Sequence, residues 1–124
     1  AMHEVSTERL ARWKGKTAFL QLDFLADRWQ EPLVGAAVDA VLSMQALHEL
    51  GNKGRAARFF MQLREIMRPG GVALVCDHLR SADDARPRFM TEEEHVRALQ
   101  EGGLLDPVTI DKDGELALFA AYNP

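Results

Sequence analysis

The stretch Ile66-Met67-Arg68-Pro69-Gly70-Gly71-Val72-Ala73-Leu74-Val75-Cys76-Asp77 joins the end of a predicted helix to a short apolar strand. Proline cannot continue a helix, and the two glycines let the chain turn tightly before it enters the strand. Upstream, one face of a helix predicted over residues 52–67 is apolar and carries Ala56, Phe59, Phe60, Leu63, Ile66 and Met67. The opposite face, which we expect to be solvated, carries Arg55, Arg58, Gln62 and Glu65. A helix that passes directly into a buried strand indicates an α/β protein.

A second apolar run, residues 37–44, is typical of a parallel strand that is covered on both faces. Strand, helix and strand in this order predict a right-handed crossover unit. A capping box at Thr91-Glu92-Glu93-Glu94 predicts a helix that stops at Gly102-Gly103, and residues 108–111 and 116–122 predict a hairpin across Asp113-Gly114. Near the start, we expect a helix capped by Ser6 that ends by Gly15, followed by a strand at residues 17–23.

Two of these segments, residues 38–50 and 63–75, resemble the fourth strand through the fifth strand of class I S-adenosylmethionine-dependent methyltransferases. Both occur together, in order and at the separation usual in that family. Residues 19–24 are similar to the third strand with its terminal acid, and the tail from Pro107 is similar to the closing antiparallel hairpin. The resemblance spans nearly the whole chain. It implies a partial Rossmann-like sheet of parallel strands with a C-terminal antiparallel hairpin, flanked by helices.

The family's glycine-rich cofactor loop has no counterpart in this sequence. Such a loop needs a strand before it and a helix after it, whereas Gly70-Gly71 and Gly102-Gly103 both follow predicted helices. Relative to the family, residues 1–124 therefore read as a single domain that lacks the first two strands at its N-terminus. S-adenosylmethionine is the expected cofactor, and we expect this chain to bind it weakly or not at all.

The resemblance also assigns a cofactor-binding set. Glu4 corresponds to the acid that holds the ribose, Asp23 to the acid that faces the adenine amino group, and Phe24 to the residue against the ring. Ser43 and Met44 correspond to the segment along the methionine arm. For Asp23 an alternative from the residues alone is a strand-end aspartate that only shapes its loop.

His48 follows the strand at residues 37–44 and is the candidate catalytic residue, a general base for an acceptor hydroxyl or amine. The alternative is a loop histidine that hydrogen-bonds the backbone. Asp77 and His78 end the next strand and could reach an acceptor. The sequence Cys76-Asp77-His78 contains three residue types that bind metals. Neighbouring residues of a strand point to opposite faces, so these side chains cannot converge and we predict no metal site. We expect Cys76 to be a small core residue.

The composition excludes several functions. The 124 residues include 15 basic and 19 acidic ones, for a formal net charge of -4, and the basic residues are scattered. This disfavours nucleic-acid binding. No apolar run is long enough to cross a membrane and the opening residues are too polar for a signal peptide. A lone cysteine favours the cytoplasm, and the expected ligand is a small-molecule substrate.

Two functions therefore compete: a methyltransferase acting on a small molecule, or a non-catalytic oligomerisation or partner-binding module derived from one. Cofactor affinity distinguishes them. Without its first two strands, the family's sheet would leave residues 37–44 with an unpaired apolar edge, and such edges recruit partners. We expect a homodimer through this exposed sheet edge, with a continued sheet or exchanged segments.

Overall fold

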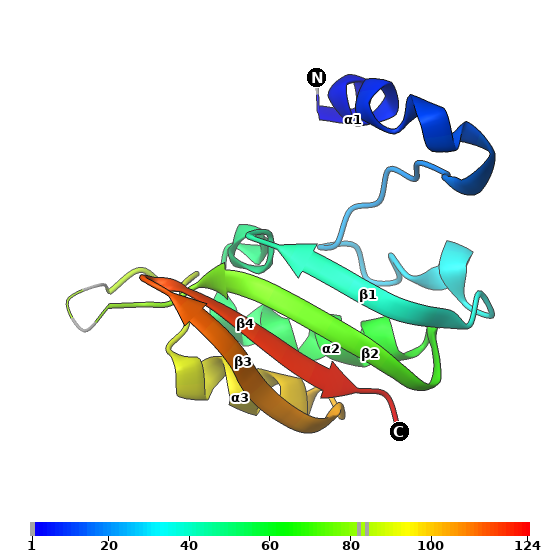
Figure 1. Cartoon of the computed structure of the whole chain (residues 1–124). Coiled ribbons are helices and arrows are strands. Elements are labelled where there is room, and N and C mark those ends of the chain that lie inside the picture. The colour runs from blue at the N-terminus through cyan, green and yellow to red at the C-terminus, as the bar shows by residue number, and fades with distance from the viewer. Residues whose placement is uncertain (1, 82, 84) are drawn as a thin grey trace.

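The computed structural model describes residues 2–81, 83 and 85–124 and contains a four-stranded sheet in the order β1-β2-β4-β3 (Figure 1). Strand β1 pairs parallel with β2, and β4 pairs antiparallel with both β2 and β3. The strands are β1 (Val38–Met44), β2 (Met67–His78), β3 (Leu105–Asp113) and β4 (Leu116–Tyr122). The α-helices are α1 (Met2–Arg9), α2 (Ala56–Arg64) and α3 (Glu92–Glu101). Short 3-10 helices are η1 (Ala11–Lys16), η2 (Glu31–Leu33), η3 (Leu47–Leu50) and η4 (Lys53–Arg55). The predicted α/β class and the parallel pair with a C-terminal hairpin are confirmed.

The Pro-Gly-Gly junction lies inside the start of β2 rather than in a turn before it. Val38 pairs with Met67, yet Ala40 pairs with Val72, so the intervening part of β2 bulges. A Cβ at Gly71 would lie 3.1 Å from the carbonyl oxygen of Val38. The glycine is needed because β1 approaches the bulge closely. The helix is correspondingly shorter than the predicted 52–67, since η4 precedes α2 and Met67 already belongs to the strand.

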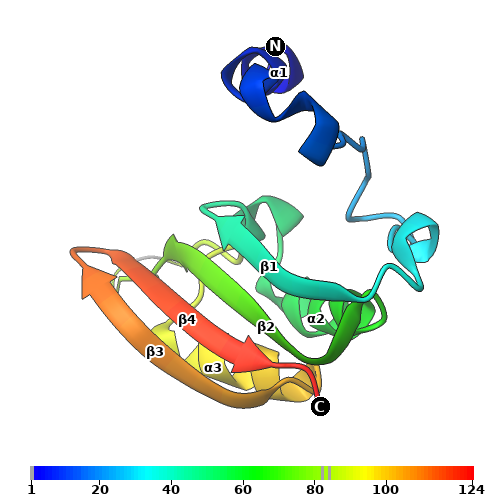
Figure 2. The same cartoon turned by 45° about the vertical axis from the view of Figure 1, so that its right-hand side comes forward.

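Helices α2 and α3 cover one face of the sheet (Figures 1 and 2). Phe60 of α2 and Phe119 of β4 are among the largest fully buried side chains, which confirms the apolar face predicted for the first helix. Gln62 was expected on the solvated face but is buried. Its amide accepts a hydrogen bond from Trp29 Nε1 at 2.9 Å and donates to the carbonyl of Asp27 at 2.7 Å. The loop before β1 packs over α2 there, which helical spacing alone does not reveal.

The C-terminal elements follow their local signals. The Thr91 hydroxyl accepts from the backbone N–H of Glu94, while the Glu94 carboxylate accepts from the backbone N–H of Thr91. This is the predicted capping box. Helix α3 ends at Glu101, before Gly102 and Gly103, and the hairpin turns at residues 114–115, where Gly114 has a φ of +59°.

The N-terminal expectations are wrong. Ser6 lies inside α1 instead of capping it, and η1 follows after Leu10. Residues 17–23 are coil with mostly exposed side chains, and they make no backbone pairing with β1 among the described residues. A strand requires a hydrogen-bonded neighbour, and although β1 is an edge strand of the sheet, the described residues show no pairing between β1 and this segment. Residues 2–20 form an arm that stands away from the sheet (Figure 2).

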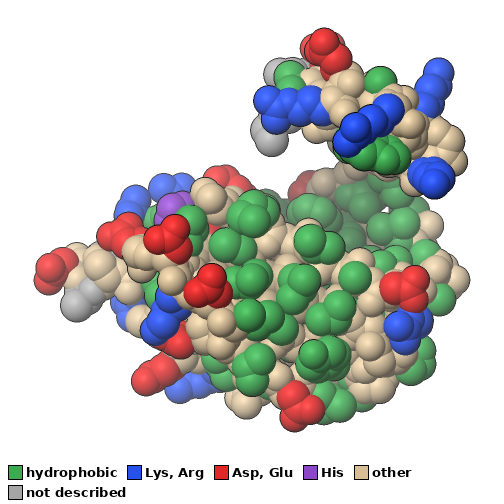
Figure 3. Space-filling view, in the orientation of Figure 1, with side chains coloured by type: hydrophobic (Ala, Val, Ile, Leu, Met, Phe, Trp, Pro, Cys, Tyr) green, Lys and Arg blue, Asp and Glu red, His purple; other side chains and the backbone are tan. Residues whose placement is uncertain are grey.

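The sheet face opposite α2 and α3 is uncovered over most of its area, and we call it the open face. Figure 3 shows apolar side chains across it, with charged groups toward the rim. The strand registers and alternating burial assign to it the apolar residues Ala40, Leu42, Met44, Val72, Leu74, Cys76, Leu105, Val108, Leu116, Leu118, Ala120 and Tyr122. The same registers place His78, Asp111 and Asp113 on this face, toward the end where β3 and β4 are joined. Cys76 therefore lies half-buried on the open face. The prediction that it is a small residue of the core is wrong.

Candidate active site at the carboxyl edge of the sheet

The carboxyl ends of β1 and β2 meet because the two strands are parallel. The chain leaves β1 through Gln45, whose φ of 50° is unusual for a residue with a side chain, and the Gln45 N–H donates to the Cys76 carbonyl at 2.7 Å. The 3-10 helix η3 then carries His48 back toward the end of β2. Ligands of open α/β sheets bind at this edge.

Asp77 is the centre of this site. Its side chain is 1% exposed, and its carboxylate accepts three hydrogen bonds. The His48 ring donates from Nδ1 to Oδ1 at 2.6 Å, the His48 backbone N–H donates to Oδ2 at 2.8 Å, and the His78 backbone N–H donates to Oδ1 at 2.8 Å. A buried carboxylate needs such partners, so His48 is held by its ring and its backbone at once.

The second ring nitrogen of His48 is directed outward. Nε2 lies 3.1 Å from Oε1 of Glu49, whose side chain is 72% exposed and free to move toward solvent. The ring stacks on Phe89 at a centroid distance of 5.3 Å. Beside it is a hollow of about 320 Å³ lined by His48, His78, Leu79, Ser81, Arg86, Phe89 and Glu115. Asp77 fixes the tautomer with the proton on Nδ1, which leaves Nε2 of the neutral ring as a proton acceptor.

His95 of α3 lies beneath the site on the helix side. It is 2% exposed and stacks on Phe119 at 4.7 Å, and its Nε2 has no hydrogen-bond partner. Burial lowers the pKa of His95, while the nearby Asp77 carboxylate acts in the opposite direction. Because a neutral His95 carries no positive charge, it does not pair with the Asp77 carboxylate as a cation. That position is left to His48.

The predicted cofactor residues are not brought together as a set. Ser43 and Met44 lie at the carboxyl edge of β1, but Glu4 lies in α1 of the arm instead of ending a strand. Asp23 accepts the backbone N–H of Leu25 at 2.9 Å, as its loop-shaping alternative predicts. The Phe24 ring contacts Trp29 and Phe59 edge-on, at 4.8 and 5.4 Å.

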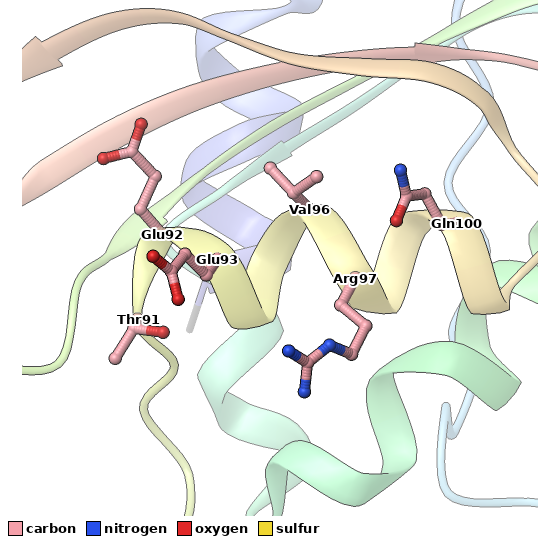
Figure 4. Close-up of a pocket in the computed structure, with 6 residues that line it drawn as sticks. All are labelled: Thr91, Glu92, Glu93, Val96, Arg97 and Gln100. Carbon is pink, nitrogen blue, oxygen red and sulfur yellow. The ribbon is translucent and has the colours of Figure 1, made fainter.

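A hollow of about 760 Å³ on the outer side of α3 is a poorer candidate (Figure 4). Its lining residues all come from α3 and its cap: Thr91, Glu92, Glu93, Val96, Arg97 and Gln100. Glu92 is already bound, because its carboxylate accepts from Lys112 at 2.7 Å and from Thr109 at 2.8 Å, and these bonds, that from Lys112 most, lower its pKa. The described residues hold no cluster of three or more potential metal ligands, and no described helix is long and apolar enough to cross a membrane.

The sequence predicted His48 and Asp77 separately and missed that they form a pair. The available signal was their position, since each follows or ends one of two adjacent parallel strands. The buried Trp29 was also missed as a contact of α2, because it lies in a loop without periodicity.

No family model matches the chain. Solved structures do match: the S-adenosylmethionine-dependent methyltransferase SibL has a TM-score of 0.74 at 15% identity, over 98% of this chain and 40% of SibL. Human N-acetylserotonin methyltransferase, solved with S-adenosylmethionine, has a TM-score of 0.63 at 16% identity, over 89% of this chain and 36% of that protein. The [4+2]-cyclase SpnF has a TM-score of 0.68 at 18% identity, over 94% of this chain and 60% of SpnF. The chain thus spans between about one third and three fifths of their lengths, and it has a partial methyltransferase fold.

Proposed function

We propose that this chain forms the acceptor side of an S-adenosylmethionine-dependent methyltransferase domain that methylates a hydroxyl or amine of a small molecule, and that the isolated chain is inactive. The observation that carries the proposal is the His48–Asp77 pair at the carboxyl edge of the sheet, 2.6 Å between Nδ1 and Oδ1. The matched methyltransferases support the reaction class through their fold alone.

The chain's own residues supply proton transfer and orientation. Bound S-adenosylmethionine would supply the methyl group from its sulfonium, and the electron pair of the broken carbon–sulfur bond would stay on sulfur in the departing S-adenosylhomocysteine. The methylated acceptor oxygen or nitrogen would lose a proton, and Nε2 of His48 is placed to take it. Asp77 then stabilises the imidazolium through the bond to Nδ1–H. A positioned general base contributes typically ~10²- to 10⁴-fold, while holding the reactants in line contributes more. The hollow beside Phe89 is where the acceptor would sit.

The residues expected to hold the cofactor do not fit it as they stand. Glu4 lies on the arm, Asp23 closes its own loop and Phe24 packs on Phe59, so only Ser43 and Met44 remain at the edge. No glycine-rich turn brings backbone donors to that edge. Weak binding of S-adenosylmethionine, detectable only at high ligand concentration, is therefore part of the proposal.

The test is a titration of isotopically labelled protein with S-adenosylhomocysteine at millimolar concentration, followed by amide chemical shifts. We expect weak, saturable shifts at residues 43–48 and 77–78, and smaller ones with adenosine monophosphate, which lacks the amino-acid arm. Shifts confined to the outer side of α3, or no shifts, would contradict the methyltransferase proposal. A micromolar or tighter Kd, about 8 kcal/mol of binding free energy, would show that the glycine loop is dispensable.

His48→Gln provides the matched variant for the acceptor side. It should leave the shifts caused by S-adenosylhomocysteine at residues 43–45 in place, because His48 serves the acceptor and not the cofactor. Loss of those shifts in a folded variant would assign His48 to cofactor binding instead.

A second function, a non-catalytic oligomerisation or partner-binding module, is favoured by the open face, where Leu42 and Met44 are 74% and 68% exposed. A titration without shifts would favour this module. Both proposals place the protein in the cytoplasm, since its sole cysteine, Cys76, is free.

A further inference from the structure

His95 of α3 is a titratable side chain in the core that the proposed proton transfer does not use. Its ring is 2% exposed and stacks on Phe119 at a centroid distance of 4.7 Å and an interplanar angle of 22°. Nε2 of His95 has no hydrogen-bond partner among the described residues. A buried polar atom without a partner lowers stability, and a phenylalanine ring would stack on Phe119 without that penalty. Packing alone therefore does not account for an imidazole at this position.

The strand register places His95 beside the Asp77 carboxylate. Val75 pairs with Phe119 and Asp77 pairs with Ala117, and all four residues are buried on the helix side of the sheet. A ring that stacks on Phe119 therefore lies next to Asp77. Burial lowers the pKa of His95, and the charge of Asp77 acts in the opposite direction, as a nearby carboxylate does. His95 thus belongs to the surroundings of the candidate site and not to a remote part of the core.

His95 is connected to the site through the backbone of His78. A hydrogen bond with that backbone also opposes the fall in the pKa of His95, so the ring is the donor and the carbonyl of His78 is the acceptor. Since Nε2 has no described partner, the donor is Nδ1. The N–H of His78 donates to Oδ1 of Asp77 at 2.8 Å. Strand β1 pairs with β2 no further than Cys76, so His95 and Asp77 hold the two backbone polar groups of His78 in its place.

We propose that His95 is a positioning residue for His48, and that it acts through the backbone of His78 to hold the Asp77 carboxylate against the His48 ring. The inference rests on the proposed role of His48 as the base. Oδ1 of Asp77 accepts both the His78 N–H and the Nδ1–H of His48, the latter at 2.6 Å. A shift of the His78 backbone therefore moves the same oxygen that keeps the His48 proton on Nδ1 and leaves Nε2 bare.

The experiment follows the histidine rings of isotopically labelled protein by NMR. Long-range ¹H–¹⁵N spectra show which ring nitrogen carries the proton, and in the wild type we expect Nδ1 for both His48 and His95. His95→Phe keeps a flat ring on Phe119 but removes the donor. It should make the Nδ1–H of His48 exchange with water about tenfold faster, the factor that one hydrogen bond is worth. The His48 tautomer with its proton on Nε2 should then appear.

Two further variants separate positioning from packing. In His95→Asn the side-chain amide nitrogen takes the place of Nδ1 and can still donate to the His78 carbonyl, so slow exchange at His48 should be largely restored. Val96→Ala is the control on the same helix. Val96 packs against the hydrophobic core, but it is apolar and can neither donate to His78 nor act on Asp77. Its loss should lower stability and leave the His48 ring unchanged.

Several results would overturn the inference. A wild-type His95 that carries its proton on Nε2 would do so without any variant, whether or not His95→Phe folds. Unchanged exchange at His48 in a folded His95→Phe would do so too, as would equally fast exchange in Val96→Ala or in a folded His95→Asn. Circular dichroism establishes folding. These spectra require neither S-adenosylhomocysteine nor an acceptor, so failure of the positioning role is distinguishable from failure of the methyltransferase proposal.

Discussion

The His48–Asp77 pair should behave as one energetic unit, and a double-mutant cycle measures this. His48→Ala removes one of the three hydrogen bonds on a carboxylate that is 1% exposed. Breaking a buried ion pair outright costs about 3–5 kcal/mol. Two backbone donors stay on Asp77 in this variant, so we expect the smaller cost of a hydrogen bond to a charged group, about 2–3 kcal/mol.

Asp77→Asn keeps the side-chain volume but replaces one acceptor oxygen with an N–H₂ donor. All three partners of Asp77 donate, so at least one of them would face the new donor. We expect a loss of about 1–3 kcal/mol. Because the His48 ring loses its charged acceptor in Asp77→Asn even where the amide oxygen still accepts its hydrogen bond, the double variant should cost about 1–2 kcal/mol less than the two single losses together.

Urea unfolding followed by circular dichroism supplies the free energies, with all variants at one protein concentration because a dimer adds to apparent stability. Glu49→Ala is the control. The Glu49 side chain is 72% exposed, and its loss should cost less than about 0.5 kcal/mol. A coupling energy below about 0.5 kcal/mol would refute the reasoning, since it would mean that the ring and the carboxylate stabilise the fold independently.

Phe60→Ala should cost about 3–5 kcal/mol because Phe60 is 1% exposed, while Arg58→Ala should cost less than about 0.5; reversed urea midpoints would mean that α2 buries the other face. The pKa of His95 is lower in the folded chain, so the unfolded chain binds a proton on this ring more readily. The free energy of unfolding should therefore fall as the pH drops below the ordinary His pKa of 6.5. His95→Phe should make the free energy of unfolding depend less on pH than in the wild type. An unchanged pH profile would mean that His95 titrates alike in both states. Gly71→Ala should cost about 1–3 kcal/mol, because three backbone oxygens lie within 3.2 Å of the new Cβ, whereas Gly15→Ala meets nothing within 4 Å and should be neutral in thermal unfolding.

Sequence patterns correctly predicted the elements that are stabilised by residues nearby in the sequence or by other elements of this chain. The capping box at Thr91 and the apolar stripe through Phe60 formed as expected, and the hairpin formed with its turn at residues 114–115, one residue later than the predicted Asp113-Gly114. Residues 17–23 failed for the opposite reason, since their apolar pattern suits a strand but no strand lies beside them. The pattern of a strand is local, but its hydrogen bonds are not.

The candidate site divides along the same line. His48 and Asp77 come together because β1, η3 and β2 are all present in the chain and fix both backbones. The cofactor-binding roles that the resemblance gives to Glu4 and Phe24 require neighbouring strands that the described four-stranded sheet does not contain. The resemblance therefore identified these residues but did not predict where they lie. Gln62 shows a further limit, because its burial under Trp29 follows from a loop with no periodic signal.

The two faces of the sheet therefore carry separable properties. Asp77 and His95 point to the helix side, where α2 and α3 complete the core and can hold His48 without help from any other polypeptide. Leu42 and Met44 point to the open face, where apolar area still needs a cover. A change on the open face should alter assembly and leave the His48–Asp77 bond intact, because no residue of that bond lies there. A change at Asp77 should lower stability on the helix side while the apolar contacts of the open face persist. Met44 lies both on the open face and in the proposed cofactor segment, so Leu42 and not Met44 is the position at which the open face can be changed without touching the proposed chemistry.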